Sequence, residues 1–390
     1  MCDARVVLVI WALAALGYTY LGYPALIALC ARVAPGRRSM STAMSMSGGG
    51  VDPDRAGPAP FISVLLAVFD GAAALPRKLD SLLAQDHPAA RIEILVYCDG
   101  CGDDSEAVAR AAAARPEAGD RIRVFADPVR RGKAVAINRL AAEARGELFL
   151  LNDVRQPLSP NAAGALAAAL ADARVGCATG RLVLGGSAGS GAYWRYEDWI
   201  RRQESRFRGV VGMTGAIAMM RRADFVPLPE DLILDDVWIP MRLCLAGKPV
   251  ALVSEAVAHD AAFDDRREFG RKVRTLAGNY QLFALLPALL VPVRNPIWLE
   301  TFSHKVLRLW APWLLAALFV ASSSAAWSLR GTCAAAMQAL VAAQLAFYLA
   351  AALGGRAGRI AGLARTFVVL NAAAVAGLWR YLSGRQRVTW

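Results

Sequence analysis

Long runs of uncharged apolar residues at both ends of the chain constrain its fold more than any other feature. Residues 6–31 contain no charged side chain, and as a helix they are long enough to span the ~30 Å hydrocarbon core of a bilayer. Three further apolar runs lie near the C-terminus, at about 309–328, 333–353 and 360–379, the last interrupted by Arg365. These runs predict one N-terminal and about three C-terminal transmembrane helices, around a middle region whose charged composition is typical of a globular domain.

Positive charge after the first apolar run predicts which side of the membrane holds the middle region. Arg32, Arg37 and Arg38 follow the run, and such clusters favour the cytoplasmic side. A cleavable signal peptide is the alternative, but the run is longer than a signal-peptide core and its basic cluster follows it. The middle region is therefore expected in the cytosol. The tail with Arg385 and Arg387 would then lie outside, unless the last run does not fully cross.

The net charge of +12 and the seven cysteines limit the classes of binding partner and metal site that the chain can have. Many of the basic residues flank the apolar runs, and no arginine-rich stripe with interleaved aromatic residues is present. Anionic lipid headgroups therefore explain the charge better than nucleic acid does, so membrane lipids are expected partners and nucleic acid is not. Cys98 and Cys101 form a CxxC pair without a second pair or a histidine at ligand spacing, which argues against a zinc or redox site.

Composition divides the chain into consecutive segments. The first segment after the N-terminal run is rich in serine, glycine, methionine and proline, as flexible linkers are. The segment after the middle domain is apolar but broken by prolines and Arg294, which indicates a position at the membrane surface. We expect an anchor at 1–35, a linker at 36–60, a globular domain at 61–280, an interfacial segment at 281–306 and a C-terminal transmembrane region at 307–390.

Strand-like and helix-like patterns alternate through the first half of the domain. The apolar runs at 61–69, 92–97, 122–126 and 148–151 have strand length, and helical patterns follow them at 75–85, 104–114, 133–144 and 161–172. Such alternation is typical of an α/β domain with a largely parallel, Rossmann-like sheet.

Aspartates stand where three of these strands end, at Asp70, Asp99 and Asp153. In open α/β sheets ligands bind beyond the carboxyl ends of the strands. Each aspartate alone is also compatible with a turn or a helix cap. Three at equivalent places favour a site for a polar ligand, a metal ion or both.

The ordered motifs of the domain resemble the family 2 glycosyltransferases, which have the GT-A fold. The resemblance covers roughly residues 60–280. The matching stretches are FISVLLAVFDG (61–71), YCDGCGDDS (97–105), RGKAVAINRLAAEARGELFLLND (131–153) and LPEDLILDDVWIPMRLCLAGKPV (228–250). With the flanking apolar runs, the chain looks most like the membrane-embedded bacterial members related to cellulose and hyaluronan synthases. This resemblance implies a multi-pass protein of the bacterial inner membrane whose catalytic domain lies in the cytoplasm.

The resemblance also implies a nucleotide-diphosphate sugar as donor and Mg²⁺ or Mn²⁺ as cofactor. Asp153 matches the first aspartate of the family's metal-binding Asp-x-Asp motif, and Arg155 replaces the second. Either Asp153 holds the metal with help from elsewhere, or Arg155 supplies positive charge to the phosphate directly. The residues that match the family's donor-binding positions are Asp70, Asp99, Asp103, Lys133, Asn138, Arg155 and Arg274.

A second pair of acidic residues matches the family's catalytic region. Asp236 stands at the position of the general base and Asp235 replaces a glutamate. A carboxylate there takes the proton of an attacking acceptor hydroxyl, and one base without an enzyme nucleophile implies inversion. Capping of the following helix is the alternative role. The segment at 210–225 resembles the acceptor segment, with candidate acceptor residues Gly212, Thr214 and Gly215.

The family's processive members carry a Gln-x-x-Arg-Trp motif, of which residues 268–281 keep the cation Arg274 but neither the glutamine nor the tryptophan. We therefore expect an inverting glycosyltransferase with a lipid-linked or polysaccharide acceptor at the inner leaflet. The missing glutamine and tryptophan argue against processive synthesis of a polymer. Two alternatives stay open: a polyprenyl-phosphate glycosyltransferase, whose acceptor is already ionised, and a non-catalytic membrane scaffold with a degenerate nucleotide-sugar domain.

Overall fold

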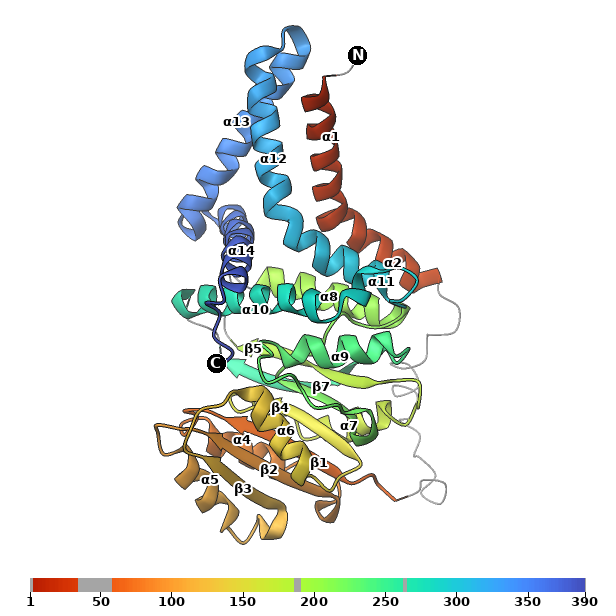
Figure 1. Cartoon of the computed structure of the whole chain (residues 1–390), viewed down its shortest axis with the longest axis vertical. Coiled ribbons are helices and arrows are strands. Elements are labelled where there is room, and N and C mark those ends of the chain that lie inside the picture. Colours follow the sequence, from red (N-terminus) through yellow and green to blue (C-terminus); the bar gives the residue numbers. More distant parts are fainter. Residues whose placement is uncertain (1–2, 34–57, 186–190, 262–264, 390) are drawn as a thin grey trace.

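The structure is a computed structural model that describes residues 3–33, 58–185, 191–261 and 265–389. It is an elongated molecule, with an α/β domain at one end and apolar helices at the other (Figure 1). The predicted linker at 36–60 lies almost entirely outside the described residues.

A seven-stranded mixed sheet forms the centre of the domain, in the order β3-β2-β1-β4-β6-β5-β7. Strands β3, β2, β1 and β4 are parallel. Strand β6 is antiparallel to its neighbours β4 and β5, and β7 runs parallel to β5. The strands are β1 (Ile62–Val68), β2 (Ile92–Asp99), β3 (Ile122–Asp127), β4 (Leu148–Asp153), β5 (Cys177–Gly185), β6 (Ile217–Arg221) and β7 (Val250–Ala261).

Helices cover both faces of the sheet, and each face carries its own apolar core. The core under α4, α5 and α7 takes Val64 and Leu66 from β1, whereas the core under α6 and α9 takes Leu65 and Ala67. Successive side chains of a strand point to opposite faces, so a strand buried on both faces is apolar throughout. These helices are α4 (Leu75–Leu83), α5 (Ser105–Ala113), α6 (Lys133–Glu143), α7 (Ala162–Ala169) and α9 (Asp235–Leu245).

The apolar ends of the chain form helices, four of which are long and apolar enough to span a membrane. Helix α1 (Ala4–Gly17) continues through a π turn (Tyr18–Gly22) into α2 (Tyr23–Val33). Helix α12 (Leu307–Ser328) packs against both α1 and α13 (Gly331–Leu353) along the long axis. The predicted arrangement of one N-terminal and three C-terminal apolar helices around a GT-A-type domain is therefore confirmed at the level of the fold.

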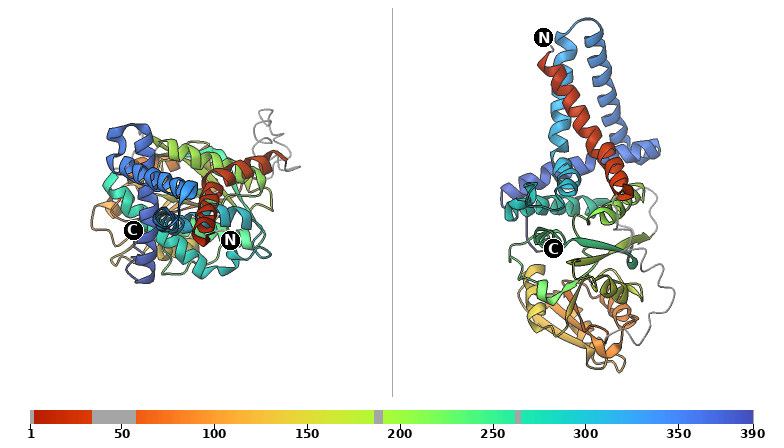
Figure 2. Two further views of the ribbon diagram at one scale, coloured as in Figure 1. Left: turned by 90° about the horizontal axis from the view of Figure 1, so that it is seen from above. Right: turned by 90° about the vertical axis from the view of Figure 1, so that its right-hand side faces the viewer.

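The last apolar helix, α14 (Arg359–Leu382), takes a different direction from the others. It lies across the long axis and packs against α10 (Asp265–Leu285), which itself lies on the domain beside α8 (Gly191–Phe207) (Figure 2). Between α10 and α12 the chain forms only short turns and two short helices, a 3₁₀ turn (Pro287–Leu290) and α11 (Trp298–Thr301), followed by a second π turn (Phe302–Val306).

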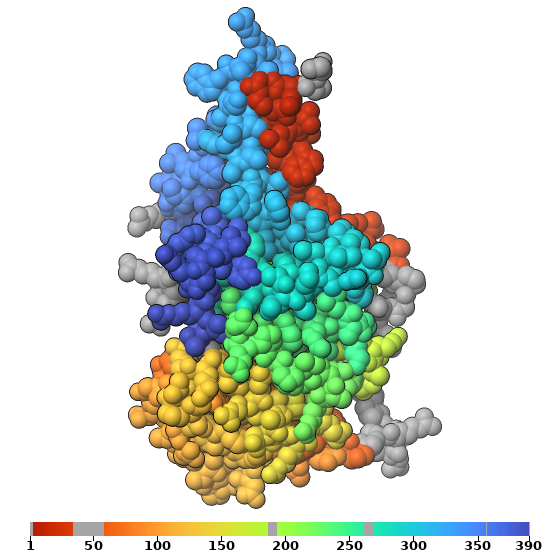
Figure 3. Space-filling view, in the orientation of Figure 1, coloured from red at the N-terminus to blue at the C-terminus, as the bar shows by residue number. Residues whose placement is uncertain are grey.

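The C-terminal residues return to the domain (Figure 3). The carbonyl oxygen of Val388 accepts a hydrogen bond of 3.1 Å from Nη2 of Arg274. A Cβ placed on Gly132 would lie 3.7 Å from Val388 and 3.9 Å from Thr389. The tail therefore lies on the same side of the apolar helices as the sheet.

Candidate active site

Lys133 joins two of the predicted site carboxylates at the carboxyl end of the sheet. Its Nζ lies 2.8 Å from Oδ1 of Asp153, the last residue of β4, and 3.0 Å from Oδ2 of Asp235, the first residue of α9. Burial opposes the charge of Lys133, but the two carboxylates outweigh it and raise the pKa of the ammonium group. Lys133 is therefore a fixed positive charge between two acidic residues that lie 82 positions apart in the chain.

Asp99 fixes the loop that presents Lys133. Its side chain is fully buried, and its two oxygens accept the backbone N–H groups of Arg131 at 2.7 Å and Gly132 at 2.8 Å. Gly132 has a φ of 104°, a left-handed conformation that glycine adopts without strain. In this arrangement Asp99 positions the start of α6, and its predicted contact with the nucleoside stays a prediction.

The two aspartates of α9 are not used as helix caps. Both lie in the first turn, where the helix dipole favours negative charge. No backbone N–H donates to either carboxylate among the residues that the structure describes, and Oδ1 of Asp236 is buried without a hydrogen-bond partner. Burial, reinforced by the neighbouring Asp235 carboxylate, raises the pKa of Asp236 to about 6, although Lys133 and Lys305 oppose the shift. A buried carboxylate with an unused oxygen is suited to accept a proton.

The predicted acceptor segment lies directly against Asp236. The N–H of Met213 donates to the backbone carbonyl of Asp236 at 2.8 Å, which ties the segment to α9. The Thr214 hydroxyl donates to the carbonyl of Gly180 at 3.0 Å, so it serves the backbone of β5. Gly212 has a φ of 110° and lies next to Val237 of α9.

Gly215 leaves open a space between two of the carboxylates. A Cβ at this position would lie 3.4 Å from Oδ2 of Asp236 and 3.5 Å from Oδ2 of Asp153. Carboxylate oxygens are the ligands that Mg²⁺ and Mn²⁺ prefer, and one oxygen of each carboxylate, Oδ2 of Asp153 and Oδ2 of Asp236, borders this space. The donor set therefore fits a hard divalent cation, with Asp153 as its principal carboxylate.

A second acidic group lies at the ends of β1 and β2. One ligand atom each from Asp70, Cys101 and Asp103 lies within 4.8 Å of the other two. Hydrogen bonds already engage this group: Asp70 accepts the N–H of Gly102 at 2.8 Å, and Asp103 accepts that of Ala72 at 2.9 Å. These bonds hold the two loops together at the edge of the predicted donor site.

The remaining predicted donor residues have partners within the protein. Asn138 exchanges two hydrogen bonds with the backbone of Leu228, at 2.9 and 2.7 Å. Arg274 donates to the carbonyl of Ile233 at 2.9 Å, just before α9. Nη2 of Arg155 lies 3.5 Å from Asp260 on β7. Asn138 and Arg274 therefore position the chain that leads into Asp235, and Arg155 lies beside Asp260.

Sequence reasoning missed three basic residues near the site. Lys78 on α4 is fully buried and donates to the carbonyl of Gln156 at 2.7 Å, directly behind the loop that follows Asp153. Burial lowers the pKa of Lys78 to about 7. Arg201 on α8 and Lys305, before α12, interact electrostatically with Asp236. All three lie outside the sequence motifs, so neither their residue type nor their spacing identifies them as site residues.

Comparisons with known proteins agree with this geometry. The profile described as "Glycosyl transferase family 2" matches residues 63–226, while a search of curated protein sequences gives no match. Among solved structures, a mannosyltransferase from Pyrobaculum calidifontis in complex with GDP-Man and Mn²⁺ superimposes with a TM-score of 0.71 at 21% identity, covering 96% of this chain and 99% of that chain.

Two further solved structures are more distant. TarS residues 1–349 from S. aureus gives a TM-score of 0.44 at 13% identity, covering 83% of this chain and 92% of that chain. GalNAc-T7 with UDP, GalNAc and Mn²⁺ gives 0.44 at 15% identity, covering 63% and 54%. The family match and the mostly parallel sheet point the same way: residues 63–226 match the model of glycosyltransferase family 2, and the domain has the GT-A fold.

Proposed function

We propose that this glycosyltransferase transfers a sugar from a nucleotide-diphosphate sugar to a hydroxyl group of a lipid-linked or polysaccharide acceptor, with inversion at the anomeric carbon. The observation that carries the proposal is the buried, unpartnered Oδ1 of Asp236 beside the Asp153–Lys133–Asp235 cluster. This arrangement places a proton acceptor, the Asp236 carboxylate, beside Lys133, whose positive charge is suited to a diphosphate.

Asp236 acts as the general base in this proposal. An acceptor hydroxyl is a poor nucleophile until its proton is removed, and a carboxylate within hydrogen-bond reach removes it as the new bond forms. The acceptor oxygen then bonds to the anomeric carbon while the bond from that carbon to the donor phosphate breaks. The proton passes to Asp236 and the nucleoside diphosphate leaves. A single direct displacement inverts the anomeric configuration.

Lys133 and Asp153 bind the diphosphate side of the donor. Asp153 would hold Mg²⁺ or Mn²⁺, which neutralises the departing diphosphate when bound. Lys133 supplies a fixed positive charge next to it, and Arg155 is a further candidate for phosphate. The Pyrobaculum mannosyltransferase, solved with GDP-Man and Mn²⁺, supports a nucleotide-diphosphate sugar as donor and a divalent cation beside it. Asp70, Asp99 and Asp103 are proposed to line the nucleoside end.

The acceptor is proposed to reach the site from the inner leaflet of a bacterial inner membrane. The basic residues after the first apolar helix, Arg32, Arg37 and Arg38, support a cytoplasmic domain. Gly212, Thr214 and Gly215 would border the acceptor, because their segment is tied to Asp236.

Asp236→Asn tests the role of the base, with Asp235→Asn as a comparison on the same helix turn. We expect Asp236→Asn to lower kcat by about 10²–10⁴ while calorimetric binding of UDP or GDP in Mn²⁺ stays within threefold of wild type. Asp235→Asn should instead weaken nucleotide binding, because Asp235 shares Lys133 with Asp153.

Two results would replace the proposal. Unchanged turnover in Asp236→Asn would indicate an acceptor that needs no base, as a polyprenyl phosphate does not. Absence of any nucleoside-diphosphate binding in the wild-type chain would favour the non-catalytic scaffold.

A further inference from the structure

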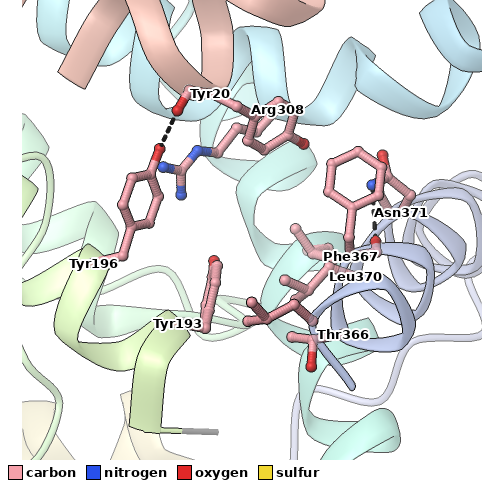
Figure 4. A pocket seen from close by; sticks show the side chains of 11 residues that line it. Tyr20, Tyr193, Tyr196, Arg308, Thr366, Phe367, Leu370 and Asn371 are labelled. Carbon is pink, nitrogen blue, oxygen red and sulfur yellow. Dashed lines mark hydrogen bonds between the residues drawn. The ribbon is translucent and has the colours of Figure 1, made fainter. Parts of the chain in front are cut away.

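A cavity of about 380 Å³ lies where the α/β domain meets the apolar helices. Its walls come from the first π turn, α8, α10, α12 and α14 (Figure 4). One side is apolar, with Leu276, Leu363, Phe367 and Leu370. This side suits a hydrocarbon chain better than a sugar polymer, which needs polar contacts along its length.

The opposite side of the cavity carries a cation among aromatic rings. In Figure 4 the guanidinium group of Arg308 lies among Tyr20, Tyr193 and Tyr196, across from Phe367. Its Cζ is 6.0 Å from the ring centroid of Tyr20 and 5.8 Å from that of Tyr196. The side chain of Arg308 is therefore part of the cavity wall.

Arg308 has donors that the protein does not use. Its Nη1 pairs with Glu197 at 2.5 Å, but Nε and Nη2 are buried without a hydrogen-bond partner. A buried donor without a partner costs about 1–3 kcal/mol, and more for a charged group. A phosphate group, with several acceptor oxygens, satisfies such donors and matches the planar guanidinium.

Cations continue from this cavity toward the catalytic carboxylate. Lys305 lies about one helical turn before Arg308 and acts electrostatically on Asp236. Arg201 on α8 also interacts with Asp236, and its Nη2 is buried without a hydrogen-bond partner. Within the described residues neither Lys305 nor Arg201 forms an ion pair. Lys305 and Arg201 therefore add positive charge near Asp236.

We propose that this cavity binds a lipid-linked acceptor, with its phosphate at Arg308 and the first part of one polyprenyl chain between Leu276 and Phe367. The attached sugar then extends past Lys305 to Asp236. This assignment rests on the proposed function, and it selects the lipid-linked acceptor over the polysaccharide. Because this assignment puts the phosphate at Arg308 and not at Asp236, it makes a sugar hydroxyl, and not the phosphate itself, the attacking group.

Thr366→Trp tests the proposal by filling the cavity from α14. Leu382→Trp on the same helix is the matched control, because Leu382 is 73% exposed and does not line the cavity. The probes are undecaprenyl phosphate, and phosphatidylglycerol as an ordinary two-chain membrane phospholipid. Retention of each lipid by the detergent-purified chain is measured by native mass spectrometry at equal concentrations.

We expect the wild type and Leu382→Trp to retain at least tenfold more undecaprenyl phosphate than phosphatidylglycerol, and Thr366→Trp to lose that excess. Arg308→Lys keeps a positive charge for Glu197 but removes the planar donors, so it should weaken retention of undecaprenyl phosphate severalfold. Equal retention of the two lipids, or unchanged retention in Thr366→Trp, would overturn the assignment.

Binding of UDP and GDP with Mn²⁺, measured on the same samples, keeps this test separate from the proposed function. Loss of lipid with intact nucleotide binding in Thr366→Trp supports the cavity assignment. A wild-type chain that binds undecaprenyl phosphate selectively but no nucleotide keeps the lipid site and rejects the proposed transfer reaction.

Discussion

At the scale of single residues, the environment of Asp236 determines when it can act as a base. Burial and the charge of Asp235 raise the pKa of its carboxyl group to about 6. A general base must be ionised, so its activity falls as the pH drops through its pKa. We expect kcat/KM to be level above pH 7 and to fall about tenfold per pH unit below about 6.

A pH series of initial rates at low substrate concentration measures this limb, with thermal unfolding followed at each pH to separate inactivation from titration. Lys133 lowers the pKa of Asp236, so Lys133→Met should move the limb to higher pH in whatever activity remains. A rate that stays level down to pH 5 would remove Asp236 from the role of base.

Gly215 allows a second prediction, because it keeps the space between two carboxylates open. In Gly215→Ala the new methyl group would make ordinary contacts of 3.4 Å with Asp236 and 3.5 Å with Asp153. The fold should therefore tolerate it, whereas a cation held by Asp153 would lose the space beside that carboxylate. We expect Mn²⁺-dependent binding of UDP or GDP to weaken at least tenfold, with little change in Tm.

Gly270→Ala is the matched control, since Gly270 lies in α10 with no atom near its added Cβ. Calorimetry with and without Mn²⁺ measures the effect. If Gly215→Ala binds the nucleotide as wild type does, the cation is not held in the space beside Gly215.

At the scale of helices and strands, the sequence predicts the parallel half of the sheet well. The strands at 62–68, 92–99, 122–127 and 148–153 are buried almost throughout, except for β3. Their continuous apolar sequences therefore predict them directly. Strands β5, β6 and β7 were not predicted. Strand β6 has five residues, and β5 is buried only over its first four residues and partly or fully exposed over the rest.

The candidate site divides in the same way. Asp153, Asp235 and Asp236 were found because motifs carry them, and the structure brings them together around Lys133 and Gly215. Lys78, Arg201 and Lys305 could not be found, since each reaches the site from an element that is distant in sequence. Their roles depend on packing between elements, which neither periodicity nor spacing records.

One network of side chains joins the apolar helices to the domain. Glu204 on α8 is fully buried and accepts hydrogen bonds of 2.6 Å from the Tyr23 hydroxyl and from Nδ1 of His304. Glu197 lies about two turns before Glu204 on α8. It is 3.0 Å from Nε2 of His304 and also pairs with Arg308. Burial opposes the charge of Glu197, but Arg308 and His304 hold its pKa well below the usual range.

Removing Glu204 should therefore loosen the contact between α2, α8 and the second π turn. Breaking a buried pair leaves its partners uncompensated and costs about 3–5 kcal/mol. We expect Glu204→Leu to lower Tm by several degrees and to increase hydrogen exchange at 298–308. Glu106→Leu on α5 serves as control, because its pair with Arg110 is exposed. Unchanged exchange at 298–308 would show that apolar packing alone holds this contact.

At the scale of the whole molecule, the direction of α14 and the position of the tail determine how the chain crosses the membrane. Helix α14 is long and apolar enough to span, yet it lies across the long axis and against α10 (Figure 2). The tail beyond it contacts Arg274 and Gly132. The same chain cannot place Val388 at the catalytic domain and beyond the far side of the bilayer, so we infer that α14 lies at the membrane surface.

This inference predicts which cysteines a membrane-impermeant maleimide reaches in intact cells. Cys333 is exposed at the start of α13, next to the turn farthest from the domain (Figure 1). With Cys2 and Cys30 replaced by serine, Cys333 should be labelled from outside. A Thr389→Cys, Cys333→Ser chain should be labelled only after the cells are opened, as a cysteine introduced at the exposed Glu106 of the domain should be.

Labelling of Thr389→Cys in intact cells, with Glu106→Cys still protected, would mean that α14 crosses the membrane and that the tail reaches Arg274 only outside the bilayer. Protection of both positions, with Cys333 labelled, leaves three crossings: the first apolar helix, α12 and α13. An odd number of crossings puts the N-terminus outside and returns the C-terminus to the side of the catalytic domain, where the contact between Val388 and Arg274 can form.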